Sequence, residues 1–294
     1  MELYQLRSFA EIAETGQLTR AAEKLHVSQP ALSAQLKALE EELDFALFER
    51  TPSGMVLTAA GKRLLADAEK VLAAAHRMLL HAKSLKGATI GKARIGTLSD
   101  PQFIRVGEFI NLATVRYPMI ELELHQGVTG EVLQRVRDGE LDAAFYYGDL
   151  MYPSVDGMKL RDIVYRVAAP ASLCEELKAA GWSEIAKHPW IIPPPISTHH
   201  RLVHALLAEH GLEPTRVVEA DQETVVASLV VSGVGIALIR EDVALQWQDA
   251  GEVCIWDGVR ITSQMWFIYL KERASDPIIS ALLEVERDVW GTPS

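Results

Sequence analysis

The chain has 294 residues, of which 49% are hydrophobic, and its 29 basic and 40 acidic side chains give a net charge of −11. This length accommodates two or more domains with cores of their own, and no segment is apolar over a stretch long enough to predict a membrane span. The amino terminus opens an amphipathic segment instead of a basic region followed by an apolar run, so we expect no signal peptide and a cytoplasmic protein.

Three consecutive helices are predicted in the first 43 residues, because apolar side chains recur there at spacings of three and four. The pattern breaks at residues 26–27, after which Ser28 can cap a new helix and Pro30 is tolerated in its first turn. This tight connection between the second and third helices predicts a helix-turn-helix unit. The inward positions are Leu3, Leu6, Phe9, Ile12 and Ala13, then Ala21, Ala22 and Leu25, then Leu32, Leu36, Leu39 and Leu43.

The outward face of the third helix is short and polar. Gln29, Ser33 and Gln35 can hydrogen bond to base edges, and Pro30 or Ala34 can pack on a thymine methyl group. This composition favours a recognition helix that enters a DNA groove. A helical hairpin packed on a third helix, with no role in DNA binding, is the alternative.

Residues 49–57, which follow Phe45, Leu47 and Phe48, predict a hairpin, because Pro52 and Gly54 mark a turn. A hairpin beside a recognition helix is typical of a wing. Arg50 in this hairpin can reach backbone phosphate or the minor groove, or it can pair with Glu49 or Glu42 of the protein itself.

Together these residues resemble the LysR-type transcriptional regulators. The matching positions are Phe9, Gly16, residues 19–22, Leu25, residues 27–33, Gln35, Leu39, Glu40, Leu47, Phe48, Arg50 and residues 57–61. The chain departs from the family at Gln17-Leu18, where Ser-Phe is usual, and at Asp44, where Gly is usual. Asp adopts the left-handed conformation less readily than Gly.

The resemblance places Gln29, Pro30, Ser33 and Gln35 where family members touch bases, and it places Arg50, Pro52 and Ser53 in the wing. The predicted contacts to double-stranded DNA are Thr19, Arg20, Ser28, Gln29, Pro30, Ser33, Gln35, Lys37, Arg50, Pro52 and Ser53. Residues 1–86 hold 11 basic and 11 acidic side chains, so a few placed cations must supply the contacts to phosphate.

Residues 59–86 predict one helix about 40 Å long. Its apolar positions alternate at spacings of four and three, which is the pattern of a coiled-coil seam. Such a seam predicts a dimer that holds two recognition helices on one face of the duplex, and by resemblance a tetramer built from such pairs is also open. A helix that packs on its own domain is the alternative. The seam residues are Leu64, Ala68, Val71, Ala75, Met78, Ala82 and Leu85.

From Ala93 onward, short apolar runs alternate with helical segments, which predicts an α/β fold with parallel strands. The expected strands are 93–98, 120–124, 141–146, 163–168, 190–192, 216–218, 234–239 and 264–269. The expected helices are 103–117, 130–138, 174–180, 198–210, 222–232 and 277–290.

We therefore expect a winged helix-turn-helix domain at residues 1–58, a linker and dimerisation helix at 59–87, and an effector-binding domain at 88–294. The resemblance implies that this last domain has two lobes like a periplasmic binding protein. Lobe I is expected at about 88–161 and 268–294, and lobe II at about 162–267. A cleft between two lobes is a natural ligand site.

Loops that follow strands and open helices supply polar groups to such a cleft, and their free N–H groups suit an anionic ligand. Asp100 would repel an anion there, unless it caps a helix that begins at Pro101. The predicted effector-binding residues are Thr97, Ser99, Asp100, Thr129, Tyr147, Ser197, Thr198 and Glu223.

The remaining chemistry-bearing residues predict no catalytic site, metal or cofactor. His199, His200, His204 and His210 cluster on one expected helix, but no neighbouring acidic or cysteine ligand completes a metal site, so contact with the effector stays open. Cys174 and Cys254 lie far apart in the sequence, and we expect no disulfide. No nucleophile elbow or phosphate-binding glycine loop is present.

The sequence thus predicts a transcriptional regulator that binds DNA as a homodimer or homotetramer and responds to a small-molecule effector of unknown identity. The alternatives are a nucleoid-type protein that uses the same winged helix without sensing anything, and a solute-binding or catalytic unit fused to a DNA reader.

Overall fold

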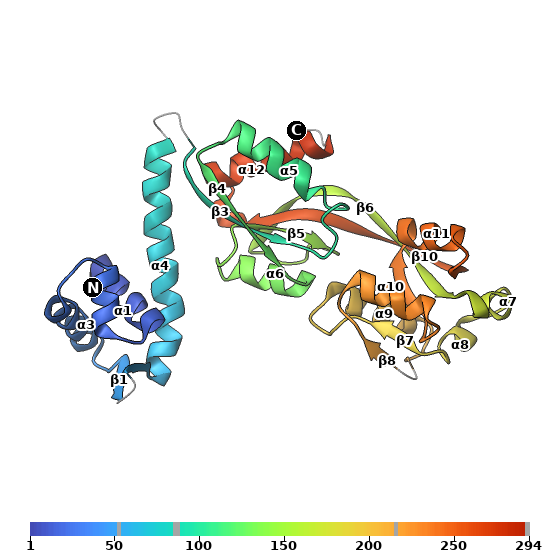
Figure 1. Ribbon diagram of the computed structural model, residues 1–294, viewed down its shortest axis with the longest axis horizontal. Coiled ribbons are helices and arrows are strands. Elements are labelled where there is room, and N and C mark those ends of the chain that lie inside the picture. The colour runs from blue at the N-terminus through green and yellow to red at the C-terminus, as the bar shows by residue number, and fades with distance from the viewer. Residues whose placement is uncertain (52–53, 85–88, 215–216, 292–294) are drawn as a thin grey trace. The chain divides into compact units, whose positions relative to one another are not determined.

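The computed structural model describes residues 1–51, 54–84, 89–214 and 217–291. The chain divides into two compact units, Met1–Lys86 and Gly87–Ser294, which Figure 1 shows as an all-helical unit with a small hairpin and an α/β unit. Each unit has its own core, and they are described in turn. Among the described residues, no helix combines the length and apolar character needed to cross a membrane.

Three short helices form the core of the first unit, namely α1 (Leu3–Thr15), α2 (Leu18–Lys24) and α3 (Gln29–Leu43). The spacing of apolar residues predicts this core well. Leu6, Phe9 and Ile12 are buried, and Phe9 packs edge-on against Phe48 with ring centroids 5.6 Å apart. Leu3 is a correction, because its side chain is 43% exposed at the first residue of α1.

The start and end of α3 follow from local chemistry. The Ser28 hydroxyl accepts a hydrogen bond from the Ala31 backbone N–H, and Pro30 occupies the first turn, where its missing N–H costs nothing. Asp44 ends the helix in the left-handed conformation with φ of 61°. Asp therefore takes the conformation that the family's usual Gly adopts at lower cost.

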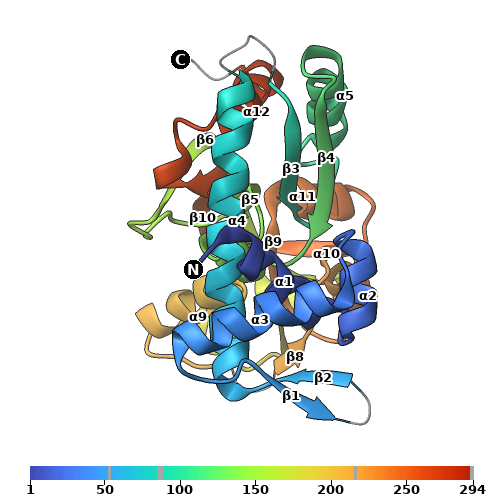
Figure 2. The same ribbon diagram turned by 90° about the vertical axis from the view of Figure 1, so that its left-hand side faces the viewer.

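The wing consists of β1 (Phe48–Thr51) and β2 (Gly54–Leu57), paired antiparallel and seen beside α3 in Figure 2. Two contacts fix it to the helices. Glu40 of α3 accepts a hydrogen bond from the Leu47 N–H at 2.7 Å, and the Met55 N–H donates to the Gly16 carbonyl at 2.8 Å. These hydrogen bonds attach the hairpin to α3 and to the end of α1.

The long helix α4 (Ala59–Ser84) begins on this core. Leu64 packs against the core and Ala68 is buried in it, so the first part of the predicted seam belongs to the chain's own domain. Further along, Val71 is 42% exposed and Met78 is 70% exposed. The Ala82 side chain and Leu85 lie outside the described residues.

The second unit is built on one six-stranded sheet of order β4-β3-β5-β10-β6-β9, with β7 and β8 forming a parallel pair beside it. The strands are β3 (Gly91–Thr97), β4 (Ile120–Gln126), β5 (Ala143–Tyr147), β6 (Val155–Pro170), β7 (Trp190–Ile192), β8 (Val217–Glu219), β9 (Ala237–Arg240) and β10 (Val253–Leu270). As predicted from the crossover helices, β3 runs parallel to both β4 and β5.

Helices cover both faces of this sheet. In Figure 1, α5 and α12 lie on one face of the β3-β4-β5 region, and α6 lies on the other. The helical elements are α5 (Val106–Arg116), α6 (Thr129–Arg137), η1 (Ala171–Leu173), α7 (Cys174–Leu177), α8 (Trp182–Ile185), α9 (Thr198–Glu209), α10 (Glu223–Val231), α11 (Glu241–Asp249), η2 (Lys271–Arg273) and α12 (Pro277–Trp290).

The two long strands β6 and β10 join two lobes. They pair with each other along most of their length, and the register shifts by one residue between Met265 and Trp266. The end of β10, from Met265 to Tyr269, also pairs with β5, while the end of β6, from Tyr165 to Ala168, also pairs with β9. We call the part that contains β3–β5, α5, α6 and α12 lobe I, and the part that contains β7–β9 and α7–α11 lobe II.

Sequence reasoning finds most of these elements and shortens two of them. The expected strands at 163–168 and 264–269 are only parts of β6 and β10, because their polar flanks obscure the alternation of apolar residues. The expected helix at 174–180 ends at Leu177, and helices α8 and α11 were not predicted. Part of the expected strand at 216–218 falls outside the described residues.

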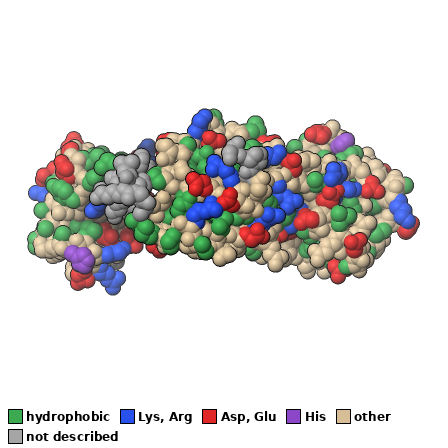
Figure 3. Space-filling model, turned by 90° about the horizontal axis from the view of Figure 1, so that it is seen from above, with side chains coloured by type: hydrophobic (Ala, Val, Ile, Leu, Met, Phe, Trp, Pro, Cys, Tyr) green, Lys and Arg blue, Asp and Glu red, His purple; other side chains and the backbone are tan. Residues whose placement is uncertain are grey.

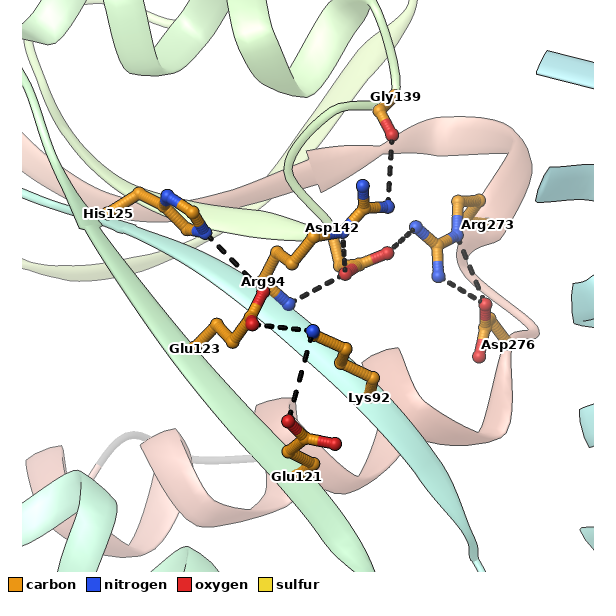
Figure 4. Close-up of polar contacts among 9 residues, drawn as sticks. All are labelled: Lys92, Arg94, Glu121, Glu123, His125, Gly139, Asp142, Arg273 and Asp276. Carbon is orange, nitrogen blue, oxygen red and sulfur yellow. Dashed lines mark hydrogen bonds and ion pairs between the residues drawn. The ribbon is translucent and has the colours of Figure 1, made fainter. Parts of the chain in front are cut away.

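A polar network closes the base of lobe I (Figure 4). Asp142 accepts a hydrogen bond from the Arg94 backbone N–H at 2.7 Å and pairs with the Arg273 guanidinium at 2.5 Å. Arg273 also pairs with Asp276, which caps α12 through the Ile278 N–H. The returning carboxyl-terminal segment is thus fastened to β3 by buried charges with their hydrogen bonds satisfied.

Strand β4 forms an edge of the same sheet, and its Glu121 and Glu123 lie on either side of Lys92 of β3 (Figure 4). Charged side chains on an edge strand such as β4 discourage pairing with a second sheet. On the face of this unit drawn in Figure 3, basic and acidic side chains are interspersed, which gives no broad basic surface suited to a phosphate backbone.

Candidate functional site

The first candidate site is the outward face of α3. Gln29, Pro30 and Lys37 are exposed there and Ser33 is half-buried, because the apolar stripe of Leu32, Leu36 and Leu39 turns the opposite face inward. Lys37 pairs with Glu41 one turn later at 3.3 Å. Three further predicted residues, Thr19, Arg20 and Ser28, are also exposed, at the start of α2 and of α3.

Gln35 differs from the expectation of a free base-reading side chain. It is half-buried, and its Oε1 atom accepts a hydrogen bond from the Ser8 hydroxyl of α1 at 2.5 Å. Its carbonyl oxygen is therefore used to fix α3 on α1, and the Nε2 donor is the group left for other partners. The pattern of residues in one helix could not reveal this partner 27 positions away.

The wing presents Arg50 as an exposed side chain in β1. Among the described residues, Arg50 forms no ion pair with Glu49 or with Glu42, whose carboxylate instead binds the amino terminus at 2.6 Å. Pro52 and Ser53, the other predicted wing residues, lie outside the described residues.

The second candidate site is a cavity of about 400 Å³ between the two lobes. Its walls come from the ends of strands and the first turns of helices in both lobes, which is the usual placement of a ligand site in an α/β fold. Six of the eight predicted effector residues line it, namely Ser99, Thr129, Tyr147, Ser197, Thr198 and Glu223.

Two predicted effector residues do not line the cavity. Thr97 is buried at the end of β3. Asp100 caps the following turn by accepting hydrogen bonds from the Gln102 and Phe103 N–H groups. The sequence left open whether Asp100 is a cap or a ligand contact, and the structure shows the cap. Asp100 also forms an ion pair with Arg240.

Thr198 is the centre of a hydrogen-bond bridge between the lobes. Its backbone N–H donates to the Thr129 hydroxyl at 2.9 Å, and its own hydroxyl donates to the Tyr147 carbonyl at 2.8 Å. Beside it, Gly130 lies so close to the Ile196 carbonyl that a Cβ atom would overlap that oxygen. The absence of a side chain at Gly130 therefore permits the lobes to approach this closely.

Arg240 is the cavity's main charged residue, and sequence reasoning missed it. Its side chain is only 4% exposed and pairs with Asp100 of lobe I at 2.7 Å and with Asp242 at 3.1 Å. The guanidinium lies 3.5 Å above the ring of Phe103. Burial disfavours the charged guanidinium, but the neighbouring carboxylates outweigh it and raise the pKa of Arg240 further above its already high value. The contacts with Asp100 and Phe103 join lobe II to lobe I.

Two buried rings form another wall of the cavity. Burial raises the pKa of the Tyr165 hydroxyl, and the Tyr165 ring packs edge-on against His199 with centroids 4.9 Å apart. The His199 Nε2 atom lies 2.8 Å from the Leu238 carbonyl. Because a carbonyl only accepts, His199 must carry its proton on Nε2, which leaves Nδ1 as an acceptor.

The histidine cluster does not behave as one site. His199 lines the cavity, whereas the rings of His200 and His204 stack on each other with centroids 4.2 Å apart. Over the part of the chain that the structure describes, no three His, Cys, Asp or Glu side chains are grouped to hold a metal ion. Cys174 and Cys254 are both free thiols.

Two family models match the chain, and together they span nearly all of it. The model described as "Bacterial regulatory helix-turn-helix protein, lysR family" matches residues 3–62. The model described as "LysR substrate binding domain" matches residues 86–291, which is more than half of the chain. The boundary between the matches falls within α4 or just beyond it.

Curated relatives and solved structures agree with these matches. BenM of Acinetobacter baylyi is 29% identical over 99% of this chain and 96% of its own, and YofA of Bacillus velezensis is 27% identical over 85% of this chain and 84% of its own. Both are named HTH-type transcriptional regulators. The structure of full-length BenM gives a TM-score of 0.54 at 26% identity, covering 99% of this chain and 97% of that one.

A structure of full-length CbnR complexed with its target DNA has the same fold. It gives a TM-score of 0.63 at 23% identity and covers 98% of this chain and 99% of that one. The likeness therefore extends over both units.

The buried His199 predicts a pH-dependent stability of the second unit. Burial lowers the pKa of His199 from its usual 6.5 to about 4. Between pH 6.5 and pH 4, the His199 side chain is therefore protonated in the unfolded chain but neutral in the folded chain. Its contribution to stability is complete above pH 6.5 and is lost as the pH falls toward 4. From about pH 7 to about pH 5 we expect a loss of about 2 kcal/mol from this residue.

The variant His199→Gln keeps an amide donor for the Leu238 carbonyl and cannot titrate. In chemical denaturation at both pH values, it should lose less unfolding free energy than the wild type. Equal losses in His199→Gln and wild type would contradict the assignment.

Proposed function

Because the chain belongs to the LysR family of bacterial DNA-binding transcriptional regulators, we propose specific residues for its reading of DNA and for its response to an effector. Members of the family join a helix-turn-helix domain to an effector-binding domain, and both are matched here. The chain is a regulator and not an enzyme. The observation that carries the proposal is the pairing of an exposed polar recognition helix with a separate, polar interlobe cavity.

Gln29 and Ser33 are the proposed base-reading residues. They lie one turn apart in the first half of α3, the part of a recognition helix that meets base edges, and no charged partner among the described residues holds their side chains. Pro30 between them offers an apolar surface to a thymine methyl group. Gln35 contributes through its remaining amide donor, since its oxygen is bonded to Ser8.

A small number of cations supplies the contacts to phosphate. Arg20 and Arg50 are the proposed contacts, with Lys37 available if its pairing with the exposed Glu41 is exchanged for a phosphate, which costs little at the surface. With so few positive charges, the affinity for DNA should depend only moderately on salt, and specificity rests mainly on base contacts and on the spacing of half-sites.

The second half of the α4 seam is proposed to make the homodimer, from which a tetramer can be built. Val71 and Met78 are exposed and do not pack against the hydrophobic core of their own unit, as far as the described residues show. Apolar residues at seam positions are stabilised by packing against a second helix. A dimer would present two recognition helices at a distance of about one helical turn of DNA, about 34 Å, or a multiple of it.

The interlobe cavity is proposed to bind the effector, and the protein is proposed to act in the cytoplasm, where bacterial DNA lies. A ligand that binds one arrangement of the lobes more tightly than another shifts the population toward it. In an assembly of several copies, this shift would change the spacing of the recognition helices and so the set of DNA sites that they fit.

The base-reading proposal is tested with Gln29→Ala and Ser33→Ala combined. On a site selected from random DNA with the wild-type chain, we expect the double variant to lose about 2 kcal/mol or more of preference for that site over unrelated DNA. Gel-shift titration against both DNAs gives the preference.

The matched control is Ser183→Ala with Gln248→Ala, which removes the same two groups from exposed positions of the second unit and should bind like the wild type. Retained preference in Gln29→Ala with Ser33→Ala would show that bases are read elsewhere. Uniform coating of DNA by the wild type would contradict a regulatory role.

The dimer proposal is tested with Val71→Glu and Met78→Glu combined, because opposing carboxylates at a seam repel each other and lose apolar burial. Light scattering after gel filtration should give the mass of one chain. Ala66→Glu, which adds the same charge at an exposed position of α4 outside the seam, should keep the mass of the wild type. An unchanged mass for the double variant would place the dimer contact outside this seam.

A further inference from the structure

The charge of the interlobe cavity is carried by one cation and several carboxylates. Arg240 is its one lining cation among the described residues, whereas Glu131, Asp221 and Glu223 are acidic lining residues. The Glu131 carboxylate already has a partner within the protein, because its Oε2 atom accepts a hydrogen bond from the Val128 N–H at 3.2 Å. The balance between Arg240 and the remaining carboxylates decides which ligands the cavity favours.

The positive charge of Arg240 is neutralised before any ligand arrives. Asp100 binds Nη2 at 2.7 Å and Asp242 binds Nε at 3.1 Å, so two carboxylates already surround one buried guanidinium. An anionic ligand would bring a further negative charge to this group. Such close like charges are costly in a site of low dielectric constant.

Glu223 is a third carboxylate at the same guanidinium. It lies in the first turn of α10, with its Oε2 atom 3.4 Å from Arg240 Nη1. Only a quarter of its side chain is exposed. Burial raises the pKa of Glu223 in spite of the nearby cation, which is the behaviour of a carboxylate whose desolvation is not compensated by the groups around it.

Two buried polar atoms on the cavity wall also lack hydrogen bonds. Within the described residues, neither Arg240 Nη1 nor the Tyr147 hydroxyl has a hydrogen-bond partner, and both residues line the cavity. Arg240 has therefore committed its charge to Asp100 and Asp242 but keeps the donor capacity of Nη1. Unpaired buried polar atoms are uncommon in folded proteins, and a bound ligand can satisfy them.

We propose that the effector is a small amino-acid-like zwitterion, whose protonated amine pairs with Glu223 and whose carboxylate oxygen accepts hydrogen bonds from Arg240 Nη1 and the Tyr147 hydroxyl. Because Nη1 and the Glu223 carboxylate lie 3.4 Å apart, the two ends of the ligand's head group must be close neighbours, as an α-amine and an α-carboxylate are. This inference rests on the proposed effector role of the cavity.

The number of carboxylates around Arg240 distinguishes this cavity from one that binds a plain carboxylate. A simple anion would add a fourth negative group around the guanidinium that Asp100, Asp242 and Glu223 already surround, and it would bring no cation to Glu223. The ammonium of a zwitterion neutralises Glu223 instead, and the summed charge of the ligand head is zero. The free N–H groups at the helix starts, which at first suggested an anion, then serve only the oxygen end of the ligand.

The probes that test this are the common L-amino acids and the matching 2-hydroxy acids, in which a hydroxyl replaces the amine on the same skeleton. Binding to the full chain is measured by thermal shift and then by calorimetry. At least one amino acid should bind, and its 2-hydroxy counterpart should bind at least about tenfold more weakly. The Glu223→Gln variant should bind the amino acid about tenfold or more weakly than the wild type does, and it should bind the hydroxy acid at least as tightly, because a carboxylate that repels an anion has been removed.

Two controls keep the result interpretable. Glu219→Gln makes the same change at an exposed glutamate of β8 outside the cavity and should bind as the wild type does. Without ligand, Glu223→Gln should melt at or above the wild-type temperature, because it removes a surplus buried charge.

Three results would overturn the proposal. They are equal affinities for amino acids and hydroxy acids, an unchanged amino-acid affinity in Glu223→Gln, and no binding of any amino acid. A hydroxy acid that binds well would refute the zwitterion and leave the effector role intact. The DNA-reading role is judged separately by the recognition-helix variants.

Discussion

A buried ion pair between the lobes, Arg240 with Asp100, is the interaction on which the second unit depends most. It comes from residues 140 positions apart, and the guanidinium is held at once by a carboxylate of lobe I, a carboxylate of lobe II and the face of Phe103. Burying these charges is favourable only while all partners are in place. The same guanidinium also lies 3.4 Å from the carboxylate of Glu223 and so contributes to placing this residue in the cavity wall.

Local sequence signals predict the first unit in detail because its structure is decided locally. Ser28 and Pro30 start α3, Asp44 ends it, and the spacing of leucines defines its buried face. What the sequence could not supply were contacts with partners far along the chain. The hydrogen bond from Ser8 to Gln35 and the burial of Ala68 in the chain's own core both turn residues with an expected external role partly inward.

In the second unit too, the sequence predicts the cavity residues that depend on local signals and misses those that depend on distant contacts. Polar residues in the loops that follow strands and precede helices, such as Ser99, Thr129 and Ser197, were predictable because parallel strands bring such loops to one edge. Arg240 and Tyr165 were not, since a charged or aromatic residue in an apolar run is equally compatible with structural burial, and for His199 the sequence left open whether the side chain contacts the effector. Only the fold shows that β6, β9 and α9 place these three residues at the same cavity. Only the fold shows, too, that among the described residues acidic side chains outnumber the single cation there, which is the basis for favouring a zwitterion over an anion.

The central claim is that the arrangement of the lobes sets how the recognition helices engage DNA, and Gly130 allows the most direct test. In Gly130→Val the added side chain must push against the Ile196 carbonyl and alter the lobe arrangement without touching α3. DNase I footprints of the wild type and this variant on the selected site should then differ in length or in half-site spacing, with circular dichroism confirming a folded chain. Identical footprints and affinities from a folded variant would contradict the account.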